Sequence, residues 1–180
     1  ATVDGNRGNG GEIIIKDKNL NVTINGKIDA TPGELGYCGK AFFGGSDIDV
    51  NELWVNNNAE LVIGGNINAS LITIQGLLGP IEKNPDTNEG RNARNNASNI
   101  TITANTLNLT VTGLITGKGQ NMTTAASSFP GSGAIINISA STFYFDGNIS
   151  IDGGDDMGAD NFGGGGNAGT LYINTINNLT

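Results

Sequence analysis

Acidic side chains gather in one glycine-rich stretch of this 180-residue chain, residues 152–161. Closely spaced carboxylates on a flexible loop could supply oxygen ligands to Ca²⁺, which takes roughly six to eight of them. The spacing matches neither the EF-hand loop nor the glycine-rich nonapeptide arrays that bind calcium. A calcium site and a solvated acidic turn both remain open, and no other cofactor is expected. The candidate ligands are Asp152, Asp155, Asp156 and Asp160.

The glycosylation pattern Asn-x-Ser/Thr occurs nine times. With 27 asparagines and 26 serines or threonines, chance would give about four such patterns. An alternating strand also produces the pattern without any glycan, because residues i and i+2 share its solvent face. Both interpretations stay open, and attached glycans would lie on outward faces or loops. The candidate sites are Asn21, Asn68, Asn96, Asn99, Asn108, Asn121, Asn137, Asn148 and Asn178.

Enzyme chemistry has few groups to use in this sequence. It contains no histidine, the usual general base and the commonest metal ligand. Degradation of acidic polysaccharides would need clustered carboxylates and a basic residue in one groove. Asp146, Asp152 and Asp155 could supply carboxylates, but Lys118 is the only basic residue after position 94. We expect no catalysis and keep polysaccharide degradation as the enzyme alternative.

Charge and apolar runs restrict the partners of the chain. The net charge is −8 and the nine lysines and arginines form no basic stripe, so nucleic acid is not an expected partner. No apolar run approaches the roughly 20 residues of a membrane-spanning helix. The single cysteine, Cys38, excludes an internal disulfide; it is either a half-buried thiol or a bridge between molecules.

The elements that must position these groups form a repeat. A glycine-rich approach leads into a strand, a polar corner, a second strand, a turn and a third short strand. Side chains alternate across a strand, so the apolar residues of each copy point inward and the Asn and Thr residues outward. In the third copy the inward residues are Ile100, Ile102, Leu107, Leu109 and Val111. The copies span residues 12–30, 52–69, 99–117, 134–154 and 170–180.

One copy cannot cover its own apolar face, but copies stacked about 4.8 Å apart can. The repeat therefore predicts a single all-β domain over residues 1–180, a right-handed parallel β-solenoid. The alternative is an antiparallel β-sandwich, in which independent strands are joined by hairpins. Residues 32–49 and 76–96 interrupt the repeat and are expected to be loop insertions.

Two strings resemble repeats of the filamentous-haemagglutinin type, Gly-Asn-Ala-Gly-Thr-Leu-Tyr-Ile-Asn (166–174) and Ala-Ser-Asn-Ile-Thr-Ile-Thr-Ala-Asn-Thr-Leu-Asn-Leu-Thr (97–110). The resemblance covers the chain from residue 97 onward and, more weakly, residues 12–30. Members of this group are large secreted adhesins with right-handed parallel β-helical shafts. The resemblance implies export, a structural shaft and no catalysis. The small size, the two insertions and the glycosylation patterns depart from that group.

The two ends of the repeat show no polar capping segment. The tail, Asn-Leu-Thr, followed by a second copy's head, Ala-Thr-Val-Asp-Gly, would resemble residues 108–117. We expect head-to-tail pairing of copies, with a cut from a longer repeat protein or fraying as the alternatives. The end residues expected to pair are Ala1, Val3, Leu171, Ile173, Ile176 and Leu179.

Three aromatic residues are predicted to face outward: Trp54, Tyr144 and Tyr172. They could stack on sugars or lie under the 76–96 insertion. The chain starts without Met or a signal peptide, as a processed exported product would, although a cut from a longer chain would look the same. The sequence thus predicts an extracellular, cell-surface structural subunit whose main partner is itself. The alternative is an adhesin fragment that binds cell-surface glycans.

Overall fold

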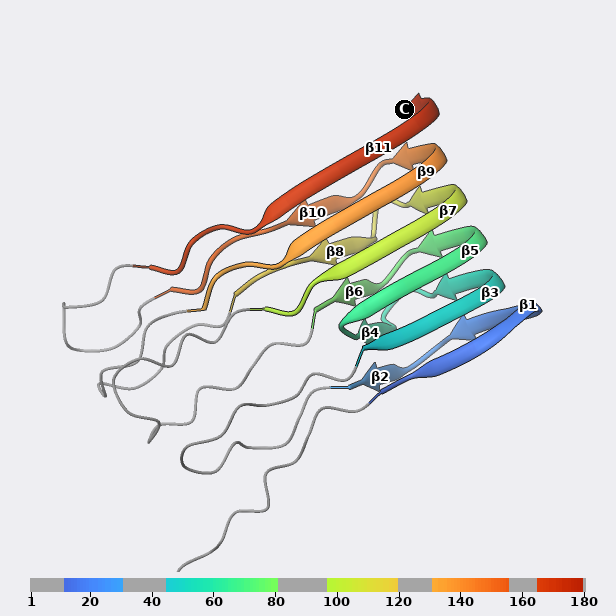
Figure 1. Ribbon diagram of the computed structural model, residues 1–180, viewed down its shortest axis with the longest axis horizontal. Coiled ribbons are helices and arrows are strands. Elements are labelled where there is room, and N and C mark those ends of the chain that lie inside the picture. Colours follow the sequence, from blue (N-terminus) through green and yellow to red (C-terminus); the bar gives the residue numbers. More distant parts are fainter. Residues whose placement is uncertain (1–11, 31–44, 81–96, 120–130, 156–164, 180) are drawn as a thin grey trace, which may run out of the picture.

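The computed structural model describes residues 12–30, 45–80, 97–119, 131–155 and 165–179, and these contain strands and turns but no helix. Long and short strands alternate along the chain (Figure 1). The long strands are β1 (Ile14–Ile24), β3 (Ser46–Val55), β5 (Gly65–Ile74), β7 (Ile100–Leu109), β9 (Ile135–Phe145) and β11 (Thr170–Leu179). The short strands are β2 (Lys27–Asp29), β4 (Glu60–Val62), β6 (Leu77–Gly79), β8 (Leu114–Thr116) and β10 (Asn148–Ser150).

The long strands form one sheet in the order β1-β3-β5-β7-β9-β11, and the short strands form a second sheet in the order β2-β4-β6-β8-β10. Every pairing in both sheets is parallel. A long strand and the short strand after it make one coil, and each coil stacks on the previous one (Figure 1). The parallel β-solenoid is therefore confirmed, and the antiparallel sandwich is wrong.

Register stacks equivalent residues of successive coils into columns that run across the strands. The column of Ile102 consists of isoleucine in all six long strands: Ile15, Ile48, Ile67, Ile102, Ile138 and Ile173. Ile102 is fully buried and Ile138 is 1% exposed, whereas Ile173 in the last strand is 40% exposed. Each inward residue is thus covered by its neighbours above and below, as a stacked repeat requires.

Each interior long strand bends at one residue that has no partner in the adjoining strand. The bend residues are Asn51, Ser70, Asn105 and Ser141. Alternation shifts there, because Ala104 and Leu107 both point inward on either side of the bend. The inward position before the bend is alanine in β5, β7 and β9, and a small side chain leaves room where the strand turns toward the core.

The second repeat copy, residues 52–69, was predicted in the wrong phase. Glu52 pairs with Asn21 in the middle of a long strand and does not begin a coil. The coil begins at Ser46, and residues 65–79 form a further coil that the repeat did not reveal. Only residues 63 and 64 connect β4 to β5, a link much shorter than the other links from a short strand to the next long strand. Gly65 enables it with a φ of 131°, and a β-carbon there would lie 2.1 Å from the carbonyl oxygen of Ser46.

Both insertions were predicted too long, and one inward residue was misplaced. Residues 46–49 belong to β3 and residues 77–79 form β6; the rest of each insertion lies largely outside the described residues. Val111 is 75% exposed because β7 ends at Leu109 and Val111 lies in the turn that follows. The turns between long and short strands contain either two residues, as at 75–76, or four, as at 110–113.

Candidate functional site

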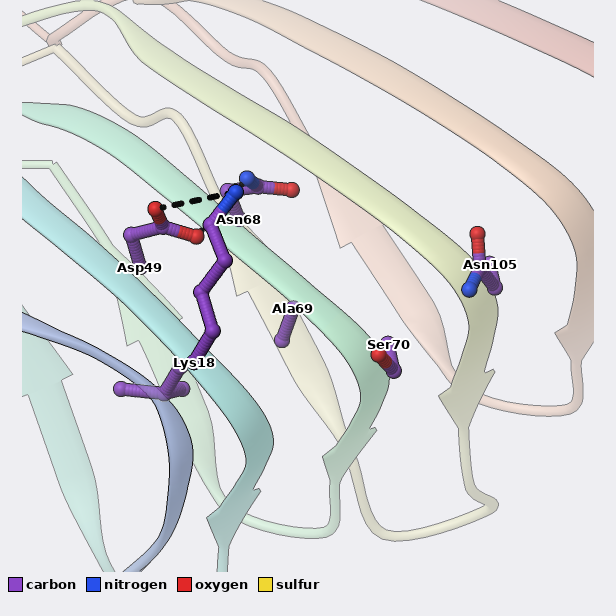
Figure 2. A pocket seen from close by; sticks show the side chains of 7 residues that line it. Lys18, Asp49, Asn68, Ala69, Ser70 and Asn105 are labelled. Atoms are coloured by element: carbon purple, nitrogen blue, oxygen red, sulfur yellow. Dashed lines mark hydrogen bonds and ion pairs between the residues drawn. The ribbon is translucent and has the colours of Figure 1, made fainter.

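A polar groove lies on the outward face of the long sheet, at the bend of the first coils (Figure 2). Lys18 reaches from β1 across β3, and its ammonium nitrogen lies 3.6 Å from Oδ2 of Asp49. The side-chain amide of Asn68 on β5 donates a hydrogen bond of 2.9 Å to Oδ1 of Asp49. The groove holds about 140 Å³ and is lined by Lys18, Asp49, Val50, Asn68, Ala69, Ser70 and Asn105.

The groove can donate and accept hydrogen bonds, but it encloses little. Its volume lies below the roughly 300 Å³ at which small-molecule pockets begin. Ser70 and Asn105 are exposed bend residues, and their side chains make no hydrogen bond to the other described residues. Such a surface can exchange hydrogen bonds with a polar molecule that lies along the sheet. The groove is not apparent from the sequence alone, because the contributing residues come from four different strands.

Seven of the nine candidate glycosylation sites lie in the described residues, all in outward positions. Asn21, Asn99, Asn148 and Asn178 are exposed, while Asn68, Asn108 and Asn137 are half-buried between neighbouring strands. Asn96 and Asn121 lie outside the described residues.

Several of these asparagines make hydrogen bonds that link adjacent coils. Oδ1 of Asn99 accepts from the backbone N–H of Ile135 at 3.1 Å. Oδ1 of Asn21 accepts from the side-chain amide of Asn51 at 2.9 Å. Polar ladders of this kind stabilise stacked parallel strands, so the recurrence of outward Asn has a structural cause whether or not glycans are attached.

The acidic stretch is described only as far as Asp155. Asp152 accepts a hydrogen bond from the hydroxyl of Ser150, and Asp155 lies 3.7 Å from the ammonium of Lys118. Among the described residues there is no group of three or more potential metal ligands. Asp156 and Asp160 lie outside the described residues, so the calcium site stays a prediction. Cys38 also lies outside them.

The outward aromatic residues do not form one platform. Trp54 is half-buried, and its ring N–H donates to Oε2 of Glu52 at 3.1 Å. Register places Trp54 and Tyr144 in the same column, separated by Thr73 and Asn108. Tyr172 pairs with Asn137 and belongs to a different column. The three positions are therefore not equivalent, because Tyr172 precedes the bend of its strand and the other two follow it.

Lysines of the first coil pair with acids of the first and second coils. The ammonium of Lys16 lies 2.6 Å from Oδ2 of Asp47; this hydrogen bond, with the negative charge of Asp47, raises the pKa of Lys16. Lys27 lies 3.1 Å from Glu60 and 3.2 Å from Asp29, and hydrogen bonds to these two carboxylates raise its pKa. Lys16 and Lys18 are two residues apart, as are their partners Asp47 and Asp49. A repeat assigned in the correct phase would have predicted these ion pairs.

The last long strand exposes apolar side chains along its free edge. Ile173 is 40% exposed, Leu179 is 54% exposed and Ile176 is 78% exposed, while Leu171 is partly buried against the core. The first long strand exposes Leu20, at 42%. The other predicted end residues, Ala1 and Val3, lie outside the described residues.

Comparisons with protein-family models, with curated proteins and with solved structures found no match. Within the described part of the chain, no helix could cross a membrane. The fold alone defines the class of this chain, a parallel β-solenoid protein.

Proposed function

We propose that this chain is a structural, non-catalytic subunit of an extracellular filament, sheath or adhesive shaft, and that copies assemble head to tail through the ends of the solenoid. The exposure of inward columns at the last strand carries this proposal. Ile173 and Leu179 belong to columns whose interior members, such as Ile102 and Leu107, are fully buried. A further strand in the same register would cover both.

The geometry of the core supports a load-bearing role. Successive coils share backbone hydrogen bonds in both sheets and a continuous apolar interior. In such an array each interface between neighbouring coils adds to the stability. Further coils can therefore be added by repeating the same interface. Fully burying one side chain of the size of Ile or Leu is worth about 1.5–3 kcal/mol, so a junction that covers several exposed residues is favourable.

Export and repeat type belong to the same proposal. Nine glycosylation patterns and the resemblance of residues 97–110 to filamentous-haemagglutinin-type repeats support a secreted shaft. Glycans on the exposed Asn148 and Asn178 would protect it from proteases. Intact-mass measurement of native material tests this, because attached glycans add mass in hexose-sized steps.

Negative-stain microscopy and light scattering of the purified chain over a wide concentration range test the assembly. We expect unbranched fibres of uniform width that lengthen with concentration. Particles that stay monomeric at every concentration would refute the proposal.

Glycan binding by an adhesin is the second candidate, and the polar groove favours it. The carboxylate of Asp49, the ammonium of Lys18 and the amide of Asn105 offer the donors and acceptors that sugar hydroxyls need. A glycan array probed with the wild-type chain and with the Asn105→Ala variant tests this. Binding to a glycan class that the variant loses would support the groove as the site; equal binding by both would place recognition elsewhere.

A further inference from the structure

The two end strands of the long sheet differ from the four between them at the bend. Each interior strand has a single residue without a partner there, such as Ser70 in β5. In β1, residues 18–20 lie between the paired Asp17 and Asn21, and in β11, residues 176–177 lie between Thr175 and Asn178. Both end strands therefore have a widened bend.

An exposed apolar side chain lies in each widened bend. Leu20 is 42% exposed in β1, and Ile176 is 78% exposed in β11. Neither belongs to an inward column of its own chain, so the columns of the described residues give neither an apolar partner. Apolar residues at matching places on the two free edges indicate a contact between those edges.

Charge on β1 restricts which strand can pair with it. Asp17 occupies the column that holds Val50 in β3 and alanine in the next three strands. Asp17 is exposed, and its Oδ1 accepts a hydrogen bond of 3.0 Å from the backbone N–H of Asn19. A carboxylate at this register position of an edge strand opposes pairing with an arbitrary strand, because an apolar partner would cover its charge. In β11 the same column holds Thr175, whose hydroxyl can donate a hydrogen bond to a carboxylate. β11 itself carries no charged residue.

We propose that β11 pairs in parallel with β1 of a second copy of this chain, in the register that continues the columns. This inference rests on the proposed function and specifies its junction. Ile173 then covers Ile15 of the second copy, Thr175 meets its Asp17 and Leu179 covers its Val22. The two widened bends oppose one another, which brings Ile176 against Leu20 of the second copy.

Charged substitutions at the two bends test this junction. Ile176→Lys and Leu20→Lys each place an ammonium against an apolar side chain, so each alone raises the concentration needed for assembly by about tenfold or more. A chain that combines Ile176→Lys with Leu20→Asp regains assembly, because opposite charges then meet. The combination of Ile176→Lys with Leu20→Lys does not regain it. Val111→Lys is the matched control: Val111 is 75% exposed in a turn and lies on neither edge.

A mixing experiment tests the polarity. The Ile176→Lys chain keeps an intact β1 edge and the Leu20→Lys chain an intact β11 edge, so an equimolar mixture forms pairs, measured by sedimentation velocity. If Leu20→Lys alone assembles like the wild type while Ile176→Lys does not, two β11 edges pair with each other and the head-to-tail junction is wrong. If both assemble normally while the wild type forms fibres, the junction is wrong but the filament function stands. A wild-type chain that never assembles refutes the function itself.

Discussion

Gly113 packs directly against Ile74: a β-carbon on Gly113 would lie 2.2 Å from the carbonyl oxygen of Ile74. Gly113 ends the turn before β8, and the equivalent turns before β6 and β10 end in Gly76 and Gly147. A β-carbon at either of those glycines would also lie within 2.5 Å of a backbone oxygen. These three turns therefore stack by backbone contact, which leaves no room for a side chain at Gly76, Gly113 or Gly147.

Replacing this glycine should destabilise the fold. Gly113→Ala forces the turn away from Ile74, and we expect it to lower the free energy of unfolding by about 1–3 kcal/mol. Gly26→Ala is the matched control, because Gly26 ends the first such turn and a β-carbon there meets nothing within 4 Å. Denaturant unfolding followed by circular dichroism measures both. Equal stability of the two variants would contradict close stacking of the turns.

The isoleucine column predicts that the cost of truncation depends on position in the stack. Ile102→Ala empties a fully buried site between two neighbours, so we expect a loss of about 2–5 kcal/mol in the free energy of unfolding. Ile173→Ala, in the 40% exposed terminal position of the same column, should cost clearly less. Both are measured at protein concentrations low enough to prevent assembly. A similar loss at the two positions would show that the stack has no exposed end in solution.

Asn99 illustrates a glycosylation pattern with a structural role. Its Oδ1 accepts from the N–H of Ile135, the first residue of β9, at 3.1 Å. Asn99→Ala leaves that donor to water, and a net loss of about 0.5–1.5 kcal/mol is expected in material without glycans. Asn148→Ala serves as the control, because Asn148 is exposed and its side chain makes no hydrogen bond to the other described residues. If both variants unfold like the wild type, the outward asparagines are not needed for stability.

The parallel solenoid could be predicted because its signal is local and repeated. Strict alternation around Ile100 and Ile102, and again around Leu107 and Leu109, determines which face is buried. The compound unit of long strand, turn and short strand then distinguishes stacked coils from hairpins. These features depend on neighbouring residues along the chain, which a single sequence contains.

Phase and surface contacts could not be predicted in the same way. The number of residues that connect one coil to the next varies along the chain. The short link at residues 63–64 depends on the positive φ of Gly65. Because the second coil was assigned in the wrong phase, its contacts with neighbouring coils could not be predicted. These contacts include the ion pair of Lys16 with Asp47 and the groove around Asp49. Val111 was misplaced for a related reason, because alternation continues in the letters of the sequence after the strand itself has ended.

Lys16 and Lys27 of the first coil make the free energy of unfolding depend on pH in the alkaline range. Hydrogen bonds to carboxylates raise the pKa of Lys16 and Lys27 above the usual 10.5. A pKa raised on folding means that the folded state holds the proton more tightly than the unfolded chain does. The pairs therefore stabilise the fold fully below about pH 10.5, and their contribution disappears as the pH rises through the raised values.

Comparison with a neutral side chain isolates this effect from other groups that titrate at high pH. At about pH 8 we expect the wild type to be more stable than the Lys16→Met, Lys27→Met double variant, and the difference should shrink at about pH 12. High salt at pH 8 should reduce it too, because both lysines are exposed and their attraction to carboxylates is screened. Lys18→Met is the matched control with a smaller difference, since its nitrogen lies 3.6 Å from Asp49. A difference that persists unchanged at pH 12 would mean that the lysines contribute through the packing of their aliphatic stems and not through charge.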